Sequence, residues 1–418
     1  MAWTKEQQLA IDQRDKNILV AAAAGSGKTA VLVERIKKLV IEEGVSIDRM
    51  LIVTFTNAAA AEMKKRISDA IDDRLSRDPN NTALRRQQLL LPRANISTVH
   101  SFCSNIIREN FYVLNVNQNF RIANESETSA MKNRIMSDVI EEMYSQKSSG
   151  FLLLSSIISG AKSDSGLEKA ILDLYKQSLS HPFPEQWIAE SVEFYNPDIP
   201  LSDTIFAKKA WKKVQDTDEY FHSILDDVYE VIDGNTVFQS DKKIAAYNKY
   251  LEFVKSFDDA VSTGEWSKIS DLIMSYEKPS YTSPGKNTKG VSEMEINTVK
   301  SGFNTIDNII TKQLQPIFSF TEEIYKNDTE LLYPAMKCLQ EMLLEFDKHF
   351  SQAKNEKGIL EFSDLEHLMI KLLVKQTDGG YEKTDFAHNL SKRFDEIMID
   401  EYQDTNEIQE LIFRAVSN

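Results

Sequence analysis

Cysteine and long apolar runs are scarce in this chain, and both shortages limit the class of protein it can be. Its 418 residues include two cysteines, Cys103 and Cys338, and neither has a second cysteine at metal-ligand spacing. A disulfide framework is therefore excluded, and a reducing cytoplasm fits best. The longest apolar clusters, such as residues 151–154, are too short to span a bilayer, and the first residues contain no apolar signal core. We therefore expect a cytoplasmic protein without a membrane partner.

An excess of positive charge is also missing. The formal net charge is -15 and the isoelectric point is about 5.0, which argues against a uniformly basic nucleic-acid coat. The charge is nevertheless segregated, because residues 1–116 carry 17 Lys and Arg against 13 Asp and Glu, a net charge of +4. With 42% hydrophobic and 27% charged residues, the chain has an ordinary globular composition and room for two or three domains.

The stretch around which the chain is organised is residues 17–29, N-I-L-V-A-A-A-A-G-S-G-K-T. Residues 18–21 predict a short buried strand, and an amphipathic helix is predicted from Thr29 to about Ile41. In the loop between them, glycines let backbone N–H groups wrap a polyphosphate. The Lys28 ammonium can meet the β- and γ-phosphates, and the Thr29 hydroxyl can bind Mg²⁺. The predicted phosphate loop consists of Ala22, Ala23, Ala24, Gly25, Ser26, Gly27, Lys28 and Thr29.

This match to the G-x-x-x-x-G-K-[ST] pattern is one residue short, because Ala22 stands where the pattern has its first glycine. A chance glycine-rich turn is the alternative.

Just upstream, residues 3–11 predict a short helix with Thr4 as its N-cap and Gln7 at capping-box spacing. A glutamine carboxamide can also pair in two places with the adenine edge. The nearby loop favours adenine recognition by Gln7 over a plain helix cap.

A second strand, turn and helix begin at residues 50–54 and continue through Phe55, Thr56 and Asn57. Thr56 and Asn57 would by default form a helix cap. Phe55 at an exposed strand end can stack on a base, and the amides of the helix N-terminus can hold a phosphate. The competing interpretation makes Phe55 a core residue.

A third such unit follows at residues 95–98, with His100 at the start of its helix. The repeated alternation is typical of a parallel α/β sheet, whose ligands gather at the carboxyl ends of the strands. His100 is either a satisfied buried histidine or a polar contact to a phosphate or ribose, and its motif leaves both open. We expect Phe55, Asn57 and His100 to line one groove.

The alternation stops at about residue 121, and residues 121–354 predict helices with apolar positions three and four apart. It returns near residue 360, and residues 394–399 predict a strand that ends in Asp400 and Glu401. The first carboxylate can bind Mg²⁺, and the second can orient and deprotonate an attacking water. A solvated acidic turn is the alternative. We expect this strand beside residues 18–21, because that arrangement brings Asp400 to Thr29.

Six motifs in this order resemble the N-terminal half of a UvrD/Rep-like superfamily 1 DNA helicase motor. They are W-T-K-E-Q-Q-L-A-I, A-G-S-G-K-T, T-F-T-N-A-A-A-A-E-M, S-T-V-H-S-F, E-F-S-D-L and D-E-Y-Q-D-T-N. The stretch between residues 102 and 360 matches only in position, as the insertion called domain 1B. Ala30 and Ala58 are more similar to the AddA/RexA type, the helicase subunits of the bacterial helicase/nuclease that resects double-strand breaks.

The resemblance implies a RecA-like P-loop NTPase domain, an α/β fold with a parallel sheet and a large inserted all-helical domain. Domain 1A would comprise residues 1–120 and 355–418, domain 1B residues 121–354, and the chain would end before the second RecA-like domain.

ATP and Mg²⁺ would be the cofactors. Gln7 would recognise adenine, residues 22–29 would bind the triphosphate with Lys28 catalytic, Thr29 and Asp400 would hold Mg²⁺, and Glu401 would activate water. Phe55, Thr56, Asn57 and His100 would touch DNA, and Gln403 and Asp404 would couple the two sites.

The implied partners are single-stranded and duplex DNA and a second, AddB/RexB-like subunit, in DNA repair and recombination. The parent would also carry an exonuclease domain. Because the second RecA-like domain and its arginine fingers would lie elsewhere, we expect this piece to be nearly inactive alone. One rival interpretation is a nucleotide-dependent switch or binding module, against which Glu401 and Phe55 argue. Another is a small-molecule kinase, which predicts a lid, an acceptor pocket and no such motif order.

Overall fold

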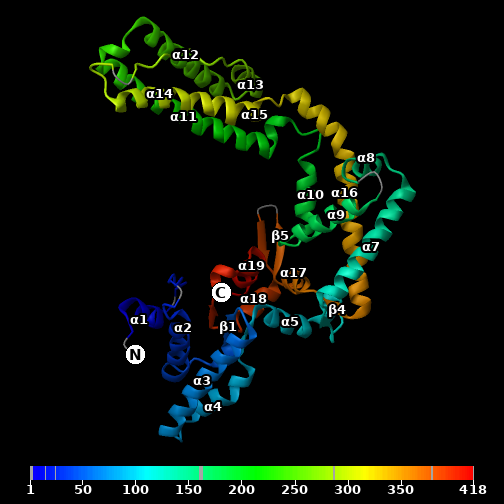
Figure 1. Ribbon diagram of the computed structural model, residues 1–418. Helices are drawn as coiled ribbons and strands as arrows, with labels where there is room; N and C mark the ends of the chain where they lie inside the picture. Colours follow the sequence, from blue (N-terminus) through cyan, green and yellow to red (C-terminus); the bar gives the residue numbers. More distant parts are fainter. Residues whose placement is uncertain are drawn as a thin grey trace. The chain divides into compact units, whose positions relative to one another are not determined.

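The computed structural model describes residues 3–14, 16–23, 25–159, 163–285, 288–377 and 380–417 (Figure 1). The chain divides into two compact units. Unit 1 comprises Met1–Ser145, Gly160–Ile188 and Met342–Asn418, and unit 2 comprises Gln146–Ser159 and Ala189–Glu341.

Unit 1 contains a three-stranded parallel sheet in the order β2-β1-β7, which confirms the predicted parallel α/β sheet. The strands are β1 (Met50–Thr54), β2 (Asn95–Thr98) and β7 (Glu396–Ile399). In the register, Leu51 faces Asn95 on one side and Ile397 on the other. Every residue of β1 is buried, as a continuous apolar run in a central parallel strand should be.

Alternate side chains of β1 enter two different cores, because successive residues of a strand point to opposite faces of the sheet. Leu51 and Val53 pack with α5 (Val99–Glu109), α17 (Phe362–Leu373) and α19 (Glu407–Val416). Met50 and Ile52 pack with α2 (Lys28–Lys37) and α3 (Asn57–Arg77). The sheet is thus covered by helices on both faces.

The predicted strand at residues 18–21 is wrong within the described part of the chain. These residues have no strand pairing, and the exposed fractions of Ile18, Leu19 and Val20 are 39%, 77% and 47%. A strand needs a neighbour that completes its hydrogen bonds and a cover over its side chains. Here no described residues supply either, and the alanines that follow offer little apolar area. The helix expected after Thr29 is confirmed, since α2 continues as a π-helical segment, Lys38–Glu42.

Where the chain leaves and re-enters the alternating region, two short strands pair in parallel. These are β3 (Arg121–Ile122) and β4 (Ile359–Leu360), and they form a sheet separate from the first. Unit 1 also contains an antiparallel pair, β5 (Val374–Thr377) and β6 (Gly380–Lys383). Its other helices are α1 (Lys5–Asp12), α4 (Thr82–Leu90), α6 (Phe111–Leu114), α7 (Glu125–Gln146), α9 (Ser165–Ser178) and α18 (Asp385–Ser391).

The described residues of unit 2 form helices and no strand. They include α8 (Ser149–Ile158), α11 (Ile205–Gly234), α12 (Asp241–Thr263), α13 (Trp266–Met274), α14 (Glu293–Asn308) and α15 (Gln315–Phe318). Helices α10 (Pro184–Glu193) and α16 (Glu322–Lys357) contribute residues to both units, and so does α7, whose last residue, Gln146, belongs to unit 2. Helices α12 and α14 both pack against α11 (Figure 1), around a core that includes Phe221, Phe257 and Phe303. None of the helices in the described ranges has both the length and the apolar character that crossing a bilayer requires.

Candidate nucleotide and DNA site

Gln7 connects the first helix to the predicted phosphate loop. Thr4 caps α1, and its backbone N–H donates to Gln7 Oε1 at 3.0 Å while its side chain accepts from the Gln7 N–H, which completes the expected capping box. The Nε2 of the same carboxamide donates to the Ser26 carbonyl at 3.1 Å. The side chain is thus both a cap and a contact of the loop, and its recognition of adenine stays a prediction.

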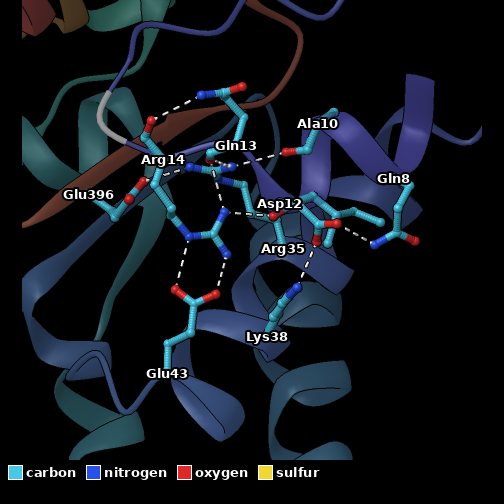
Figure 2. Close-up of polar contacts among 10 residues, drawn as sticks. Gln8, Ala10, Asp12, Gln13, Arg14, Arg35, Lys38, Glu43 and Glu396 are labelled. Atoms are coloured by element: carbon cyan, nitrogen blue, oxygen red, sulfur yellow. Dashed lines mark hydrogen bonds and ion pairs between the residues drawn. The ribbon is translucent and has the colours of Figure 1, made fainter. Parts of the chain in front are cut away.

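Two arginines hold α1 against α2 (Figure 2). Arg35 Nη1 donates to the carbonyls of Ala10 and Gln13, at 3.0 and 2.5 Å. Carbonyls at the end of a helix have no partner within the helix, and Arg35 supplies a donor to these two. Arg14 binds Glu43 through two N–H groups, with distances of 2.9 and 2.6 Å. The hydrogen bonds from Arg14 lower the pKa of Glu43 despite its partial burial.

A third contact joins the same two helices, because Lys38 Nζ lies 2.7 Å from Asp12 Oδ1 and lowers the pKa of that carboxyl. Arg35 also reaches Glu396 on β7, with a distance of 3.4 Å. These contacts fix the position of α1, which carries Gln7, relative to α2, which carries Lys28 and Thr29. Sequence reasoning missed them, since the partners lie more than 20 residues apart along the chain and belong to no motif.

The loop itself depends on two glycines. Gly25 and Gly27 have φ angles of 78° and 86°, in the left-handed region that glycine adopts without steric cost. Apart from Gly25 and its two chain neighbours, no described residue has an atom within 4 Å of a Cβ placed on Gly25, so the requirement for glycine comes from the backbone conformation and not from crowding. Lys28 Nζ donates to the Ala22 carbonyl at 3.1 Å, which places the ammonium over the loop. Ala24 lies outside the described residues.

Asp400 lies beside Thr29, with 3.4 Å between Oδ2 and the threonine Oγ1. The backbone N–H of Asp400 donates to the Val53 carbonyl and extends the pairing of β7 with β1. The expectation that a strand at residues 18–21 brings these two side chains together is wrong. Packing does it instead, because Ile36 of α2 shares a core with Met398 of β7.

The surroundings of Asp400 are short of positive charge. Burial, followed by the neighbouring Glu401, raises the pKa of Asp400, and the opposing contributions of Thr29 and Lys28 do not cancel this. Two ligands at right angles on Mg²⁺ lie about 3 Å apart, given bonds of about 2.1 Å. A threonine hydroxyl and a carboxylate 3.4 Å apart therefore fit a hard cation.

Glu401 adopts an unusual backbone conformation for a residue other than glycine, with a φ of 56°. Gln403 Nε2 donates to Glu401 Oε2, and the Asp404 N–H donates to the Glu401 carbonyl at 3.0 Å. The turn therefore gathers the three residues, and the roles in catalysis and coupling remain predictions. A strained residue at the end of a strand is a common feature of functional sites.

The predicted DNA-contacting residues follow β1 and β2. Phe55 has an exposed fraction of 68%, so the interpretation of Phe55 as a core residue is wrong. Thr56 accepts a hydrogen bond from the Ala59 N–H and caps α3, and Asn57 is the first residue of that helix and is exposed. Because Thr54 and Thr98 are partners in the sheet, Phe55 and the start of α5 lie at one edge.

His100 has a carboxylate partner that the sequence did not reveal. Its Nε2 lies 3.2 Å from Oε1 of Glu366, a buried residue of α17 that also accepts from Gln409 at 2.7 Å. Burial raises the pKa of Glu366, but the hydrogen bonds from His100 and Gln409 outweigh it and leave the pKa lowered. Because an ionised carboxylate only accepts, Nε2 of His100 is the donor. Glu366 and Gln409 each follow a motif within a few residues, which is the signal that could have found them.

The model of the UvrD/REP helicase N-terminal domain family matches residues 3–418. The chain belongs to this family. Among curated relatives, it is 37% identical over 426 residues to an ATP-dependent helicase/nuclease subunit of Clostridium perfringens, a match that covers 99% of this chain and 33% of that protein. The proteins of the same name from Clostridium beijerinckii and Clostridioides difficile are 36% and 34% identical, over 99% and 100% of this chain and 33% of each relative. The chain thus spans about a third of the length of these relatives.

In this UvrD/REP-family chain, the E-F-S-D-L motif has a structural role. Glu361 and Asp364 form a capping box at the start of α17. The ammonium of Lys354, a buried residue of α16, lies 2.6 Å from Asp364 and 3.8 Å from Glu361. Phe362 between them is exposed and lies 4.7 Å from the His100 ring, measured between centroids. The motif therefore fixes the helix that supplies Glu366 to His100.

Proposed function

We propose that the chain is the N-terminal ATP-binding motor portion of an ATP-dependent DNA helicase/nuclease. The observation that carries the proposal is the approach of Asp400 to Thr29, since the two residues lie 371 positions apart in the sequence. Membership of the UvrD/REP helicase N-terminal domain family and the names of the curated relatives support it. We also propose a role in double-strand break resection and recombinational repair, which the resemblance of the motifs to the AddA/RexA type implies.

The chain's own residues divide the work of ATP hydrolysis. The Gln7 carboxamide would pair with adenine, and the backbone of residues 22–29 would wrap the phosphates with the Lys28 ammonium on the β- and γ-groups. Thr29 and Asp400 would hold Mg²⁺, which when bound neutralises charge on the phosphate oxygens. Glu401, oriented by Gln403, would take the proton of the attacking water.

DNA would lie along the edge of the sheet that carries Phe55 and the start of α5. Phe55 would stack on a base, and Thr56, Asn57 and His100 would contact the backbone with little sequence preference. The shared partner Glu366 connects His100 to Gln409, which follows the Asp400 motif on α19. This connection would couple the DNA site to the nucleotide site, in addition to the coupling proposed for Gln403 and Asp404.

The proposed domain organisation is domain 1A in residues 1–120 and 355–418 and an inserted helical domain 1B in residues 121–354. The pairing of β3 with β4 supports it, because it joins the two ends of the proposed insertion. Each relative is named as one subunit of a helicase/nuclease, so we also propose that the chain works with a second subunit, in the cytoplasm. A nucleotide switch without helicase activity is not favoured, since it needs no water-activating glutamate.

A nucleotide titration tests the proposal. We expect the chain to bind a fluorescent ATP analogue in the presence of Mg²⁺ and Lys28→Ala to weaken binding by about tenfold or more, because hydrogen bonds to charged groups are worth roughly 1.5–3 kcal/mol. Lys16→Ala, a change in an exposed lysine outside the phosphate loop, is the matched control. Equal affinities of the wild type and the Lys28 variant would contradict the proposal.

A further inference from the structure

A polar cluster on unit 2 lies outside the proposed nucleotide and DNA sites. Asp218 and His222 are four residues apart on α11, so their side chains share one face of the helix. Asp258 comes from α12. The rings of Phe221 and Phe257 pack with 5.4 Å between centroids, and these two residues directly precede His222 and Asp258. The register of the two helices is therefore set by a buried aromatic pair beside the cluster.

The three side chains converge. His222 Nε2 lies 2.8 and 3.0 Å from the two oxygens of Asp258. One ligand atom from each of Asp218, His222 and Asp258 lies within 4.8 Å of the others. The Oδ1 of Asp218 is buried and has no hydrogen-bond partner among the described residues.

The cluster brings two carboxylates, Asp218 and Asp258, close to one another. Two negative charges so close together repel each other, and a bound cation would offset that repulsion. An exposed ion pair would account for the contact of His222 with Asp258, although such pairs contribute little to stability. It would not explain why Asp218 presents an unpartnered oxygen in the same place, because a buried acceptor without a partner is costly.

We propose that Asp218, His222 and Asp258 bind a divalent cation of the zinc class, which joins α11 to α12. An imidazole nitrogen with two carboxylates suits Zn²⁺, whereas Ca²⁺ and Mg²⁺ prefer oxygen ligands alone. His222 is half-exposed, so water can complete the coordination from the solvent side. The site needs neither nucleotide nor DNA, and its test is independent of the function proposed above.

The test is a calorimetric titration of the chelator-stripped 418-residue chain with Zn²⁺, without nucleotide. We expect one saturable site that is lost in part or whole in His222→Ala and Asp258→Asn, with affinity at least about tenfold lower, as even changes behind a metal ligand cost 10–100-fold. His349→Ala is the matched control, since His349 pairs with Glu345 at 3.5 Å, also four residues apart, without a third ligand among the described residues.

Thermal melting supplies a second readout that does not depend on calorimetry. Zn²⁺ should raise the melting temperature of the wild type and of the His349 variant and leave that of the His222 variant unchanged, because a ligand that binds the folded state stabilises it. Circular dichroism of the zinc-free variants shows whether each has folded. The proposal is overturned if the folded His222 variant binds Zn²⁺ as tightly as the wild type, or if Ca²⁺ competes with Zn²⁺ at equal concentration.

Discussion

At the scale of single residues, Gln7 shows how one carboxamide is already engaged before any nucleotide binds. Its Oε1 closes the capping box with Thr4, and its Nε2 contacts the Ser26 carbonyl. Pairing with adenine would use the same two atoms. A nucleotide would therefore have to share or replace these hydrogen bonds, and the phosphate loop would sense the exchange through Ser26.

Phe55→Ala separates a DNA contact from a packing role. Phe55 is 68% exposed. The free energy of unfolding of the variant should therefore lie within about 0.5 kcal/mol of the wild-type value, as is usual for surface substitutions. Binding of single-stranded DNA by the protein that carries the whole motor should weaken about 5- to 150-fold, because stacking on a base is worth roughly 1–3 kcal/mol. Nucleotide affinity without DNA should hardly change.

The matched control for Phe55 is Leu89→Ala, another exposed apolar side chain, at 78% exposure on α4. It should leave DNA affinity unchanged in the same titration. A Phe55 variant with wild-type DNA affinity, or with a large loss of stability, would remove the stacking role.

Asp400→Asn should stabilise the chain at neutral pH while removing Mg²⁺-dependent nucleotide binding. Burial and Glu401 raise the pKa of Asp400, so the folded chain binds this proton more tightly than the unfolded chain. Stability therefore falls as pH rises from the unfolded to the folded pKa, and the penalty persists above the folded pKa. The variant's advantage in melting temperature should shrink toward acid pH.

Asp395→Asn is the control, and its expected effect on stability has the opposite sign. Its hydrogen bonds from Arg49 lower the pKa of Asp395, so this carboxylate stabilises the fold above its unfolded pKa and loses that effect as pH falls. Asp395→Asn should thus lower the melting temperature at pH 7 and leave nucleotide binding intact. If both variants melted alike across the pH range, the charge argument for Asp400 would fail.

At the scale of elements, α1 depends on α2 and not on its own length. A helix of eight residues is marginal by itself, and contacts with Arg35 and Arg14 hold its C-terminal end. Arg35 contacts α1 and β7 together, so one side chain joins the helix of Gln7 to the strand of Asp400. The nucleotide site is therefore assembled from three elements that share this arginine.

Arg35→Met tests that assembly. The change keeps an apolar stem but leaves the half-buried Ala10 carbonyl without its donor, whereas the Gln13 carbonyl keeps its hydrogen bond from Arg14 Nη1. We expect a cost of at most about 1–3 kcal/mol. We expect faster hydrogen exchange of the α1 amides and weaker nucleotide binding. Arg66→Met, which breaks an exposed pair with Glu62 on α3, should cost less than about 1 kcal/mol and serves as the control. Unchanged hydrogen exchange of the α1 amides would contradict the prediction, because it would show that the other contacts hold α1 without Arg35.

At the scale of the whole molecule, the proposed function would give the described chain one wall of a motor site. In the proposed motor, a second RecA-like domain would supply an arginine finger, which is worth roughly 10³–10⁵ in the rate of phosphoryl transfer. The 418-residue chain should therefore bind Mg²⁺-ATP yet hydrolyse it slowly and without stimulation by DNA. Steady-state phosphate release measures this, with Glu401→Gln as the background control. Rapid, DNA-stimulated turnover by the chain alone would contradict the expectation.

Local features of the sequence predicted much of the sheet and of the nucleotide loop. The strands at residues 50–54, 95–98 and 396–399 follow from short apolar or β-branched runs bounded by polar turns. Gly25 and Gly27 were recognisable because a left-handed backbone selects glycine. These properties depend on neighbours in the chain, so the sequence by itself determined them.

Contacts between distant segments were decided by the tertiary structure alone. The apolar run at residues 18–21 looked like a strand, but periodicity does not say whether a partner completes its hydrogen bonds. Thr29 meets Asp400 through the packing of α2 on the sheet, and His100 meets Glu366 through the packing of α5 on α17. Such pairs depend on register and helix placement across hundreds of residues, which no local pattern encodes.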